Sequence, residues 1–100
     1  MEKYFLFVNS SVDYLLLPAK NFIGAKYSSA TIIDLYFEKS PLSYKIPLTV
    51  TDSKGEEVAR QIAEIIRMHP KSVIKFSDIE SSYAIEDVTA VGTFTHIVTQ

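Results

Sequence analysis

Alternation of apolar and polar positions predicts two paired β-strands in the first half of the chain. Residues 31–37 place an apolar side chain at every second position, at Ile33, Leu35 and Phe37. Residues 44–50 repeat the alternation, and the short segment between the two runs has the composition of a turn. We therefore expect an antiparallel hairpin. Because Pro47 has no N–H to donate, the second strand lies at a sheet edge or is paired at Pro47 on its other side alone.

The N-terminal segment has more continuous apolar runs. Residues 3–8 and 14–17 predict a first hairpin around a polar turn at residues 9–11, and residues 22–27 predict a further short strand. Because these runs alternate less clearly than the later ones, we expect them to be covered on both faces.

From residue 53 the apolar residues recur with a period of 3.6 instead of two. The apolar stripe there consists of Val58, Ile62, Ile65, Ile66 and His69. Ser53 and Glu56 are spaced as a capping box, in which each side chain would bind the other's backbone N–H. Pro70 disfavours helical geometry at the residue before it. The pattern predicts one amphipathic helix over residues 53–69.

Three short β-rich runs follow the helix, at residues 73–76, 83–88 and 91–98. The expected fold class is therefore α+β: a mostly antiparallel, curled sheet of about six to eight short strands, with one amphipathic helix (residues 53–69) between strands. One helix covers only one face of such a sheet, so the sheet must curl on itself or meet another surface. We expect a single domain over residues 1–100.

Composition narrows the function classes. Of the 100 residues, 47% are hydrophobic and 22% are charged, which suits one globular core. The absence of cysteine excludes disulfides, thiol catalysis and thiolate metal sites. A net charge of −2 disfavours nucleic-acid binding, which needs clustered basic residues. No apolar run reaches signal-peptide or membrane-spanning length, so we expect no membrane partner and a cytoplasmic protein.

The sequence contains none of the metal-binding, phosphate-binding or nucleophile motifs considered. His69 and His96 lack metal-ligand spacing, and the three glycines form neither a phosphate loop nor a nucleophile elbow. We assign no catalytic, cofactor-binding or metal residue and expect no enzyme. The acidic residues near the C-terminus could hold a divalent cation or form a glycosidase-like pair, but we expect them in solvated loops: Asp78, Glu80, Glu86 and Asp87.

The predicted interface is the strand pair at Tyr36, Lys45 and Pro47, which would meet identical copies of the chain. Tyr36 lies on the polar face of its strand and is the aromatic residue best placed for an exposed contact; most of the other aromatic side chains are expected in the core. The alternative is a binding module for another viral or host protein, or for nucleic acid, through Lys3, Lys20, Lys26 and Lys45. A third class is a small enzyme that uses His69 or His96 with a carboxylate.

The strand, strand and capped-helix unit formed by residues 30–37, 46–51 and 53–62 resembles a pattern found in small uncharacterised proteins of marine cyanophages. The resemblance covers about a third of the chain and brings no catalytic residue. It implies a viral accessory or virion-associated protein that forms a homo-oligomer, in the host cytoplasm or in the virion. The expected function is that of a non-enzymatic phage structural or assembly protein.

Overall fold

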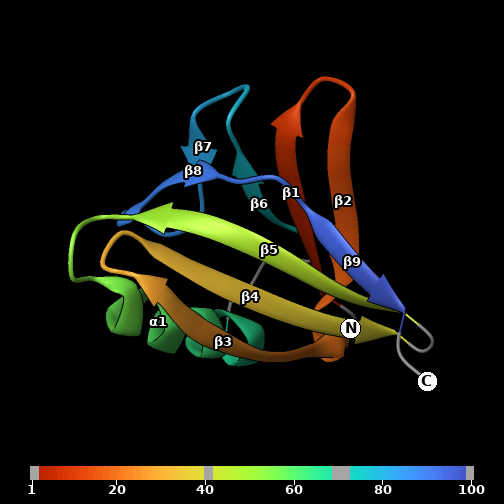
Figure 1. The fold of residues 1–100 in the computed structure, drawn as a ribbon, viewed down its shortest axis with the longest axis horizontal. Coiled ribbons are helices and arrows are strands. Elements are labelled where there is room, and N and C mark those ends of the chain that lie inside the picture. The colour runs from red at the N-terminus through yellow and green to blue at the C-terminus, as the bar shows by residue number, and fades with distance from the viewer. Residues whose placement is uncertain (1–2, 40–41, 69–72, 99–100) are drawn as a thin grey trace.

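A computed structural model describes residues 3–39, 42–68 and 73–98. Its elements in chain order are β1 (Tyr4–Ser10), β2 (Asp13–Pro18), the short 3-10 helix η1 (Ala19–Asn21), β3 (Phe22–Ser29), β4 (Ile32–Lys39), β5 (Leu42–Val50), α1 (Gly55–Met68), β6 (Val73–Ser77), β7 (Ser82–Tyr83), β8 (Val88–Val91) and β9 (Thr95–Val98). Figure 1 shows them as two sheets and one α-helix. The α+β class is confirmed.

The prediction of one curled sheet is wrong, because the strands form two sheets. One has the order β2-β1-β6-β7, and the other has the order β3-β4-β5-β8, with β9 also paired to β5. The strands of the two sheets cross at a steep angle in Figure 1. η1 turns the chain from the edge of the first sheet to the edge of the second. All strand pairs are antiparallel except β1 with β6, which are parallel.

A cluster of phenylalanine rings joins the two sheets. Phe5 and Phe7 of β1, Phe76 of β6 and Phe37 of β4 are fully buried. The ring centroids of Phe7 and Phe76 are 5.5 Å apart, and those of Phe5 and Phe37 are 5.6 Å apart at an edge-on angle. The expected inward packing of the aromatic residues is confirmed for these four. Because each sheet covers the inner face of the other, the core needs the helix only along one side.

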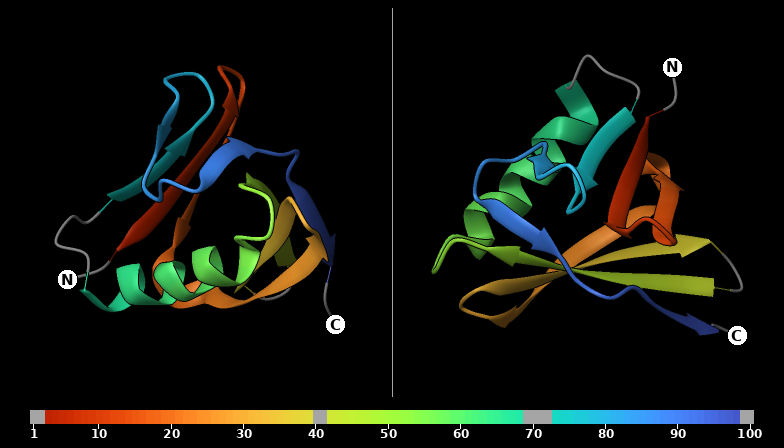
Figure 2. Two further views of the ribbon diagram at one scale, coloured as in Figure 1. Left: turned by 90° about the vertical axis from the view of Figure 1, so that its left-hand side faces the viewer. Right: turned by 90° about the horizontal axis from the view of Figure 1, so that it is seen from above.

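The helix runs along β3 and β4, and Val58 and Ile62 of its predicted stripe are fully buried (Figure 2). It begins at Gly55 and ends at Met68, while His69 and Pro70 lie outside the described residues. The prediction of a capping box between Ser53 and Glu56 is wrong. Ser53 has a φ of 64° and its N–H donates to the Ala30 carbonyl, so this N–H is already satisfied without Glu56.

Pro47 lies inside the five-stranded sheet and not at its edge. Of the two predicted arrangements, this is the one in which the strand is paired at Pro47 on its other side alone. The Val50 N–H donates to the Thr31 carbonyl at 2.8 Å, which fixes the alternation of the β4–β5 ladder and turns the Pro47 backbone away from β4. On that other side, β9 pairs with β5 only as far as Lys45, and the pairing of β8 with β5 begins at Leu48. The missing N–H therefore falls in a gap between two partner strands.

The strands after the helix are shorter than predicted. Residues 84–87 form turns and bends between β7 and β8, and residues 92–94 separate β8 from β9. Gly92 explains the second break, because its N–H donates to the Pro47 carbonyl at 2.7 Å and an added Cβ would lie 2.8 Å from Pro47 Cγ. The two N-terminal hairpin strands and β3 are confirmed.

Gly55 sets how closely the helix approaches the sheet. A Cβ at this position would lie 2.6 Å from Ile33 Cγ2 of β4. We expect Gly55→Ala to lower the free energy of unfolding by about 1–3 kcal/mol, because the clash in the core outweighs the better helix propensity of alanine. Gly24→Ala is the matched control, since a Cβ there meets nothing within 4 Å. Equal denaturation midpoints for the two variants would contradict this account.

Lys3 ties the N-terminus to the far end of the helix. Its Nζ donates to the Ile66 carbonyl at 2.8 Å and to the Ile65 carbonyl at 3.3 Å. Both are among the last carbonyls of α1, which have no partner within the helix and carry the negative end of its dipole.

Replacing Lys3 by methionine keeps most of the apolar stem and removes the charge. We expect Lys3→Met to cost about 0.5–1.5 kcal/mol of unfolding free energy at low salt, and less at high salt. Lys26→Met removes an exposed lysine on β3 and serves as the control. Urea denaturation of both variants at two salt concentrations measures the effect, and a loss in Lys3→Met that salt does not reduce argues against the helix-end contact.

Candidate functional site

The structure brings the three predicted interface residues together on the outer face of the five-stranded sheet. Tyr36 and Lys45 are register partners on β4 and β5, and Pro47 lies two residues further along, opposite Asp34. All three are half-buried. Asp34, expected on an open polar face, is only 9% exposed. This face is therefore narrower and more enclosed than the alternation predicted, and its role as an interface stays a prediction.

The four lysines of the alternative binding surface do not share one location. Lys3 is engaged at the end of α1, and Lys20 lies on η1, where the chain passes between sheets. Lys26 and Lys45 lie on the outer face of the five-stranded sheet, where Lys26 is opposite Asp34 and Lys45 is opposite Tyr36. This arrangement lacks the continuous row of basic side chains that a phosphate backbone requires.

The outer face of the four-stranded sheet is the most apolar exposed surface in the described part of the chain. Tyr14 and Leu16 of β2 are 65% and 51% exposed, and Val12 in the preceding turn is 90% exposed. Their neighbours on this face are Tyr4, Leu6 and Val8 of β1 and Val73 of β6. The expectation that the N-terminal runs are covered on both faces is wrong, because the second sheet and the helix cover their inner side alone.

β2 also presents an open backbone edge within the described residues. The Ala19 N–H donates to the Lys3 carbonyl at 2.8 Å, and this bond fixes the alternation of the β1–β2 ladder. The backbone groups of Leu15 and Leu17 consequently point toward β1, and those of Tyr14 and Leu16 point away from it. The free edge thus carries the same residues that expose the apolar side chains.

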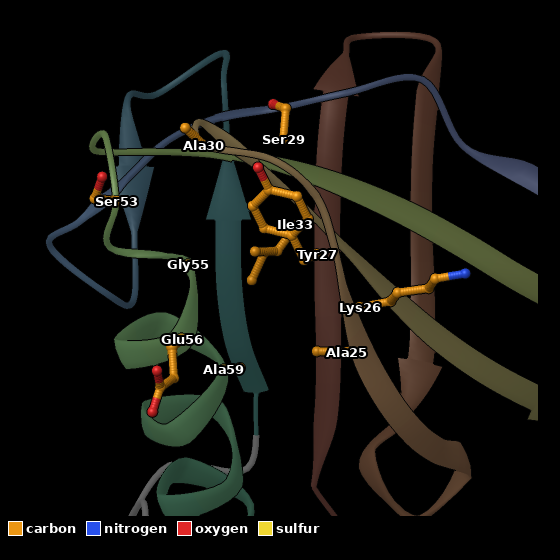
Figure 3. Close-up of a pocket in the computed structure, with 10 residues that line it drawn as sticks. All are labelled: Ala25, Lys26, Tyr27, Ser29, Ala30, Ile33, Ser53, Gly55, Glu56 and Ala59. Carbon is orange, nitrogen blue, oxygen red and sulfur yellow. The ribbon is translucent and has the colours of Figure 1, made fainter.

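A groove of about 550 Å³ opens between α1 and β3 (Figure 3). Its sheet side includes Ala25, Tyr27 and Ile33, and its helix side includes Gly55, Glu56 and Ala59. The Glu56 carboxylate is bound to Arg60 at 2.8 Å. The described lining residues include one carboxylate and no histidine. The groove therefore suits binding of an apolar segment better than acid–base chemistry.

Asp78 is a structural residue, contrary to the expectation of a solvated loop. Its Oδ1 accepts hydrogen bonds from the Tyr83 hydroxyl at 2.7 Å and from the Val91 N–H at 2.9 Å. Desolvation, together with the hydrogen bond and the negative charge of Asp78, raises the pKa of Tyr83 to about 12. The carboxylate thus connects the turn between β6 and β7 to β8, and so one sheet to the other.

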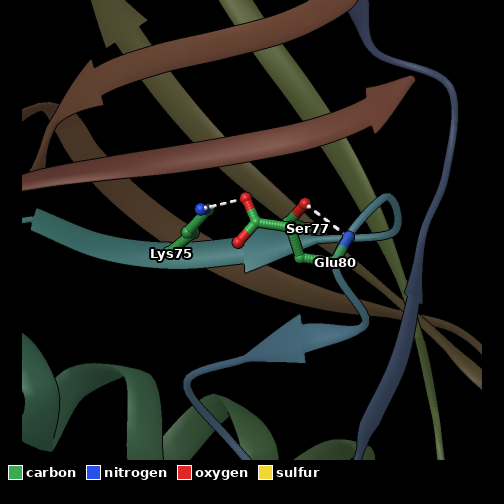
Figure 4. A network of polar contacts seen from close by, with 3 residues as sticks. All are labelled: Lys75, Ser77 and Glu80. Carbon is green, nitrogen blue, oxygen red and sulfur yellow. Dashed lines mark hydrogen bonds and ion pairs between the residues drawn. The ribbon is translucent and has the colours of Figure 1, made fainter. Parts of the chain in front are cut away.

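The neighbouring Glu80 is held as well. Its carboxylate pairs with Lys75, and its backbone N–H donates to Ser77 Oγ at 3.3 Å (Figure 4). Both side chains of the ion pair are at least one-third exposed. Glu80 orders this turn and is not part of a carboxylate pair.

The described residues contain no group of three acidic or histidine side chains that could hold a metal ion. His69 lies outside them, and His96 lies in β9 opposite Tyr44 in register. None of the described helices has the length and apolar character needed to cross a membrane. No protein-family model, curated protein or solved structure matches this chain.

The raised Tyr83 pKa makes a pH-dependent contribution to stability. The neutral hydroxyl is favoured in the folded state, so its contribution is complete below pH 10 and is lost as the pH rises from 10 through 12. We expect the difference in unfolding free energy between wild type and Tyr83→Phe to shrink over this range. Asp78→Asn keeps an acceptor without the charge and should lower the Tyr83 pKa toward 10. Denaturation at pH 8 and pH 11.5 tests both, and a difference that is constant with pH contradicts the assignment.

Proposed function

We propose that the protein is a non-enzymatic assembly protein that forms a homo-oligomer through the β2 edge of its four-stranded sheet. The observation that carries the proposal is the coincidence, on one strand, of an open backbone edge and exposed apolar side chains. Natural proteins usually protect such edges with charged residues, prolines or bulges. In β2 such protection is confined to the ends, Asp13 and Pro18, and the four uncharged residues between them form an apolar edge, which is typical of a surface that pairs with another strand.

A second copy of the chain fits this edge because β2 is complementary to itself. From Tyr14 to Leu17 the strand carries no charge, and Asp13 begins it. In an antiparallel pair with Leu15 opposite its own copy, Tyr14 lies opposite Leu16 of the second copy, and the contact occurs twice by symmetry. Asp13 then lies opposite Leu17 of the second copy, so no like charges meet.

The expected strength follows from the buried area. Pairing two β2 edges places Tyr14 of each copy beside Leu16 of the other but leaves the outer face in water, so it removes on the order of 200 Å² of apolar surface, worth roughly 5 kcal/mol at 25 cal/mol per Å². Association costs about 4–15 kcal/mol in lost freedom of motion. The gain is at the lower end of this cost, so we expect a weak, reversible, concentration-dependent dimer that further contacts stabilise in a larger assembly.

The biological setting in this proposal comes from the resemblance of residues 30–37, 46–51 and 53–62 to proteins of marine cyanophages. An assembly protein of a phage would act in the host cytoplasm or in the virion. The apolar character of the β2 surface favours a protein partner over nucleic acid, because its side chains offer no cation to a phosphate.

Sedimentation equilibrium of the whole chain tests the proposal. We expect wild type to exceed the 11.3 kDa monomer mass at high concentration, and Leu16→Lys to sediment as a monomer, because the lysine would meet the apolar partner strand. Ile79→Lys is the matched control: Ile79 is 55% exposed in a turn outside this face, and the variant should associate like wild type. A monomeric wild type, or equal association of Leu16→Lys and wild type, would overturn the proposal.

A further inference from the structure

We propose that the groove between α1 and β3 binds an extended segment of another protein, which adds as an antiparallel strand to β3 and places an acidic residue opposite Lys26. This site lies on the other sheet from β2 and takes a different partner, so it does not depend on self-association. It rests on three features of the described residues: an open edge, a groove beside it, and the exposed Lys26, which has an opposite charge on its β4 side, at Asp34, and none on the open side.

The open edge has a defined set of backbone groups. In the β4 ladder, Ile33 and Leu35 bond toward β5, so Asp34 and Tyr36 bond toward β3. Their register partners are Lys26 and Gly24. The N–H and C=O groups of Ala25 and Tyr27 consequently point away from β4, toward the open edge of the sheet. Within the described residues β3 pairs with β4 alone. An added strand finds two donors and two acceptors there.

The groove lies where the side chains of such a strand would go. Residues of the added strand opposite Ala25 and Tyr27 share the face of these two side chains, which line the groove. Gly55 and Ala59 on the helix side are small and leave the volume of about 550 Å³ open. Tyr27 is 72% exposed and would be covered by the incoming chain. Aliphatic residues at these two positions of the ligand fit the apolar walls.

The charge of Lys26 determines the residue between them. Lys26 is among the lining residues, and its side chain extends away from the helix in Figure 3. The alternation of the strand places it on the face that the middle residue of the added strand would share. Lys26 is exposed and lies opposite the nearly buried Asp34 of β4, without a direct ion pair among the described residues. Its other side, at the open edge, has no acidic neighbour in β3. Opposite charges across a strand pair are favourable and like charges are unfavourable. The preferred ligand therefore has an acidic residue between two aliphatic ones.

The same charge argues against a second copy at this edge. Residues 22–29 of β3 contain no acidic side chain. In an antiparallel pair of two β3 strands, Lys26 would lie opposite Lys26, Gly24 or Ser28 of the other copy, depending on the register, and none of these is an anion. A foreign acidic strand is thus favoured over self-pairing at β3, in contrast to the uncharged β2.

Two matched peptides test the site with the full chain. The probes are capped, fluorescein-labelled Ser-Val-Glu-Val-Ser and Ser-Val-Lys-Val-Ser, titrated by fluorescence anisotropy at low salt. We expect the glutamate peptide to bind at least about threefold more tightly to wild type. Lys26→Met removes the charge without placing a like charge opposite Asp34, so the variant should fold like wild type and bind the two peptides equally. No binding up to millimolar protein, or an unchanged preference in Lys26→Met, would overturn the proposal.

Amide hydrogen exchange locates the bound strand. The Ala25 and Tyr27 amides point to the open edge and should exchange quickly in the free chain, whereas the Gly24 and Lys26 amides are bonded to β4. The glutamate peptide should slow exchange at Ala25 and Tyr27 specifically. Binding without this protection would place the peptide elsewhere and refute strand addition. Protection of both amides in the free chain, increasing with its concentration, would show that a second copy occupies the edge and would also refute the proposal.

Discussion

The packing of two sheets against each other through one cluster of phenylalanine rings is the constraint on which the other features depend. Phe5, Phe7 and Phe76 from one sheet meet Phe37 from the other, and all are fully buried. Since each sheet supplies the cover for the other, a single helix suffices to close the core along β3 and β4. The arrangement leaves the outer face of the four-stranded sheet without cover, whereas the outer face of the five-stranded sheet is partly enclosed around Asp34.

The two outer faces differ in chemistry for a physical reason. On the five-stranded sheet, charged and polar side chains surround the nearly buried Asp34, and the Gly92 connection covers Pro47. On the four-stranded sheet, the apolar runs of β1 and β2 leave Tyr14, Leu16 and Val73 in water. Apolar exposure of this kind is favourable to remove, so the second face has the stronger tendency to associate.

The two open edges are distinguished by charge. β2 is uncharged over its central residues and complements a copy of itself, whereas β3 carries Lys26 and no acid. Backbone pairing alone is indifferent to the partner, since every strand offers the same donors and acceptors. Side chains next to the ladder therefore select the partner: an identical strand for β2 and an acidic one for β3.

The sequence by itself determined the local elements. Period-two and period-3.6 patterns depend only on which side chains share a face, and they correctly predicted the β4–β5 hairpin and a helix that buries Val58 and Ile62. Apolar runs correctly predicted β1 to β3. The tertiary structure decided what lies opposite each face. It determined the separation into two sheets, the Lys3 contact with α1, the hydrogen bonds of Asp78 and the exposure of Tyr14. Each of these depends on residues that are far apart in the sequence. Such contacts leave no periodic signal, because the residues that form them are far apart in the sequence. The loss of chain entropy on bringing distant segments together is offset only by the packing of the whole core.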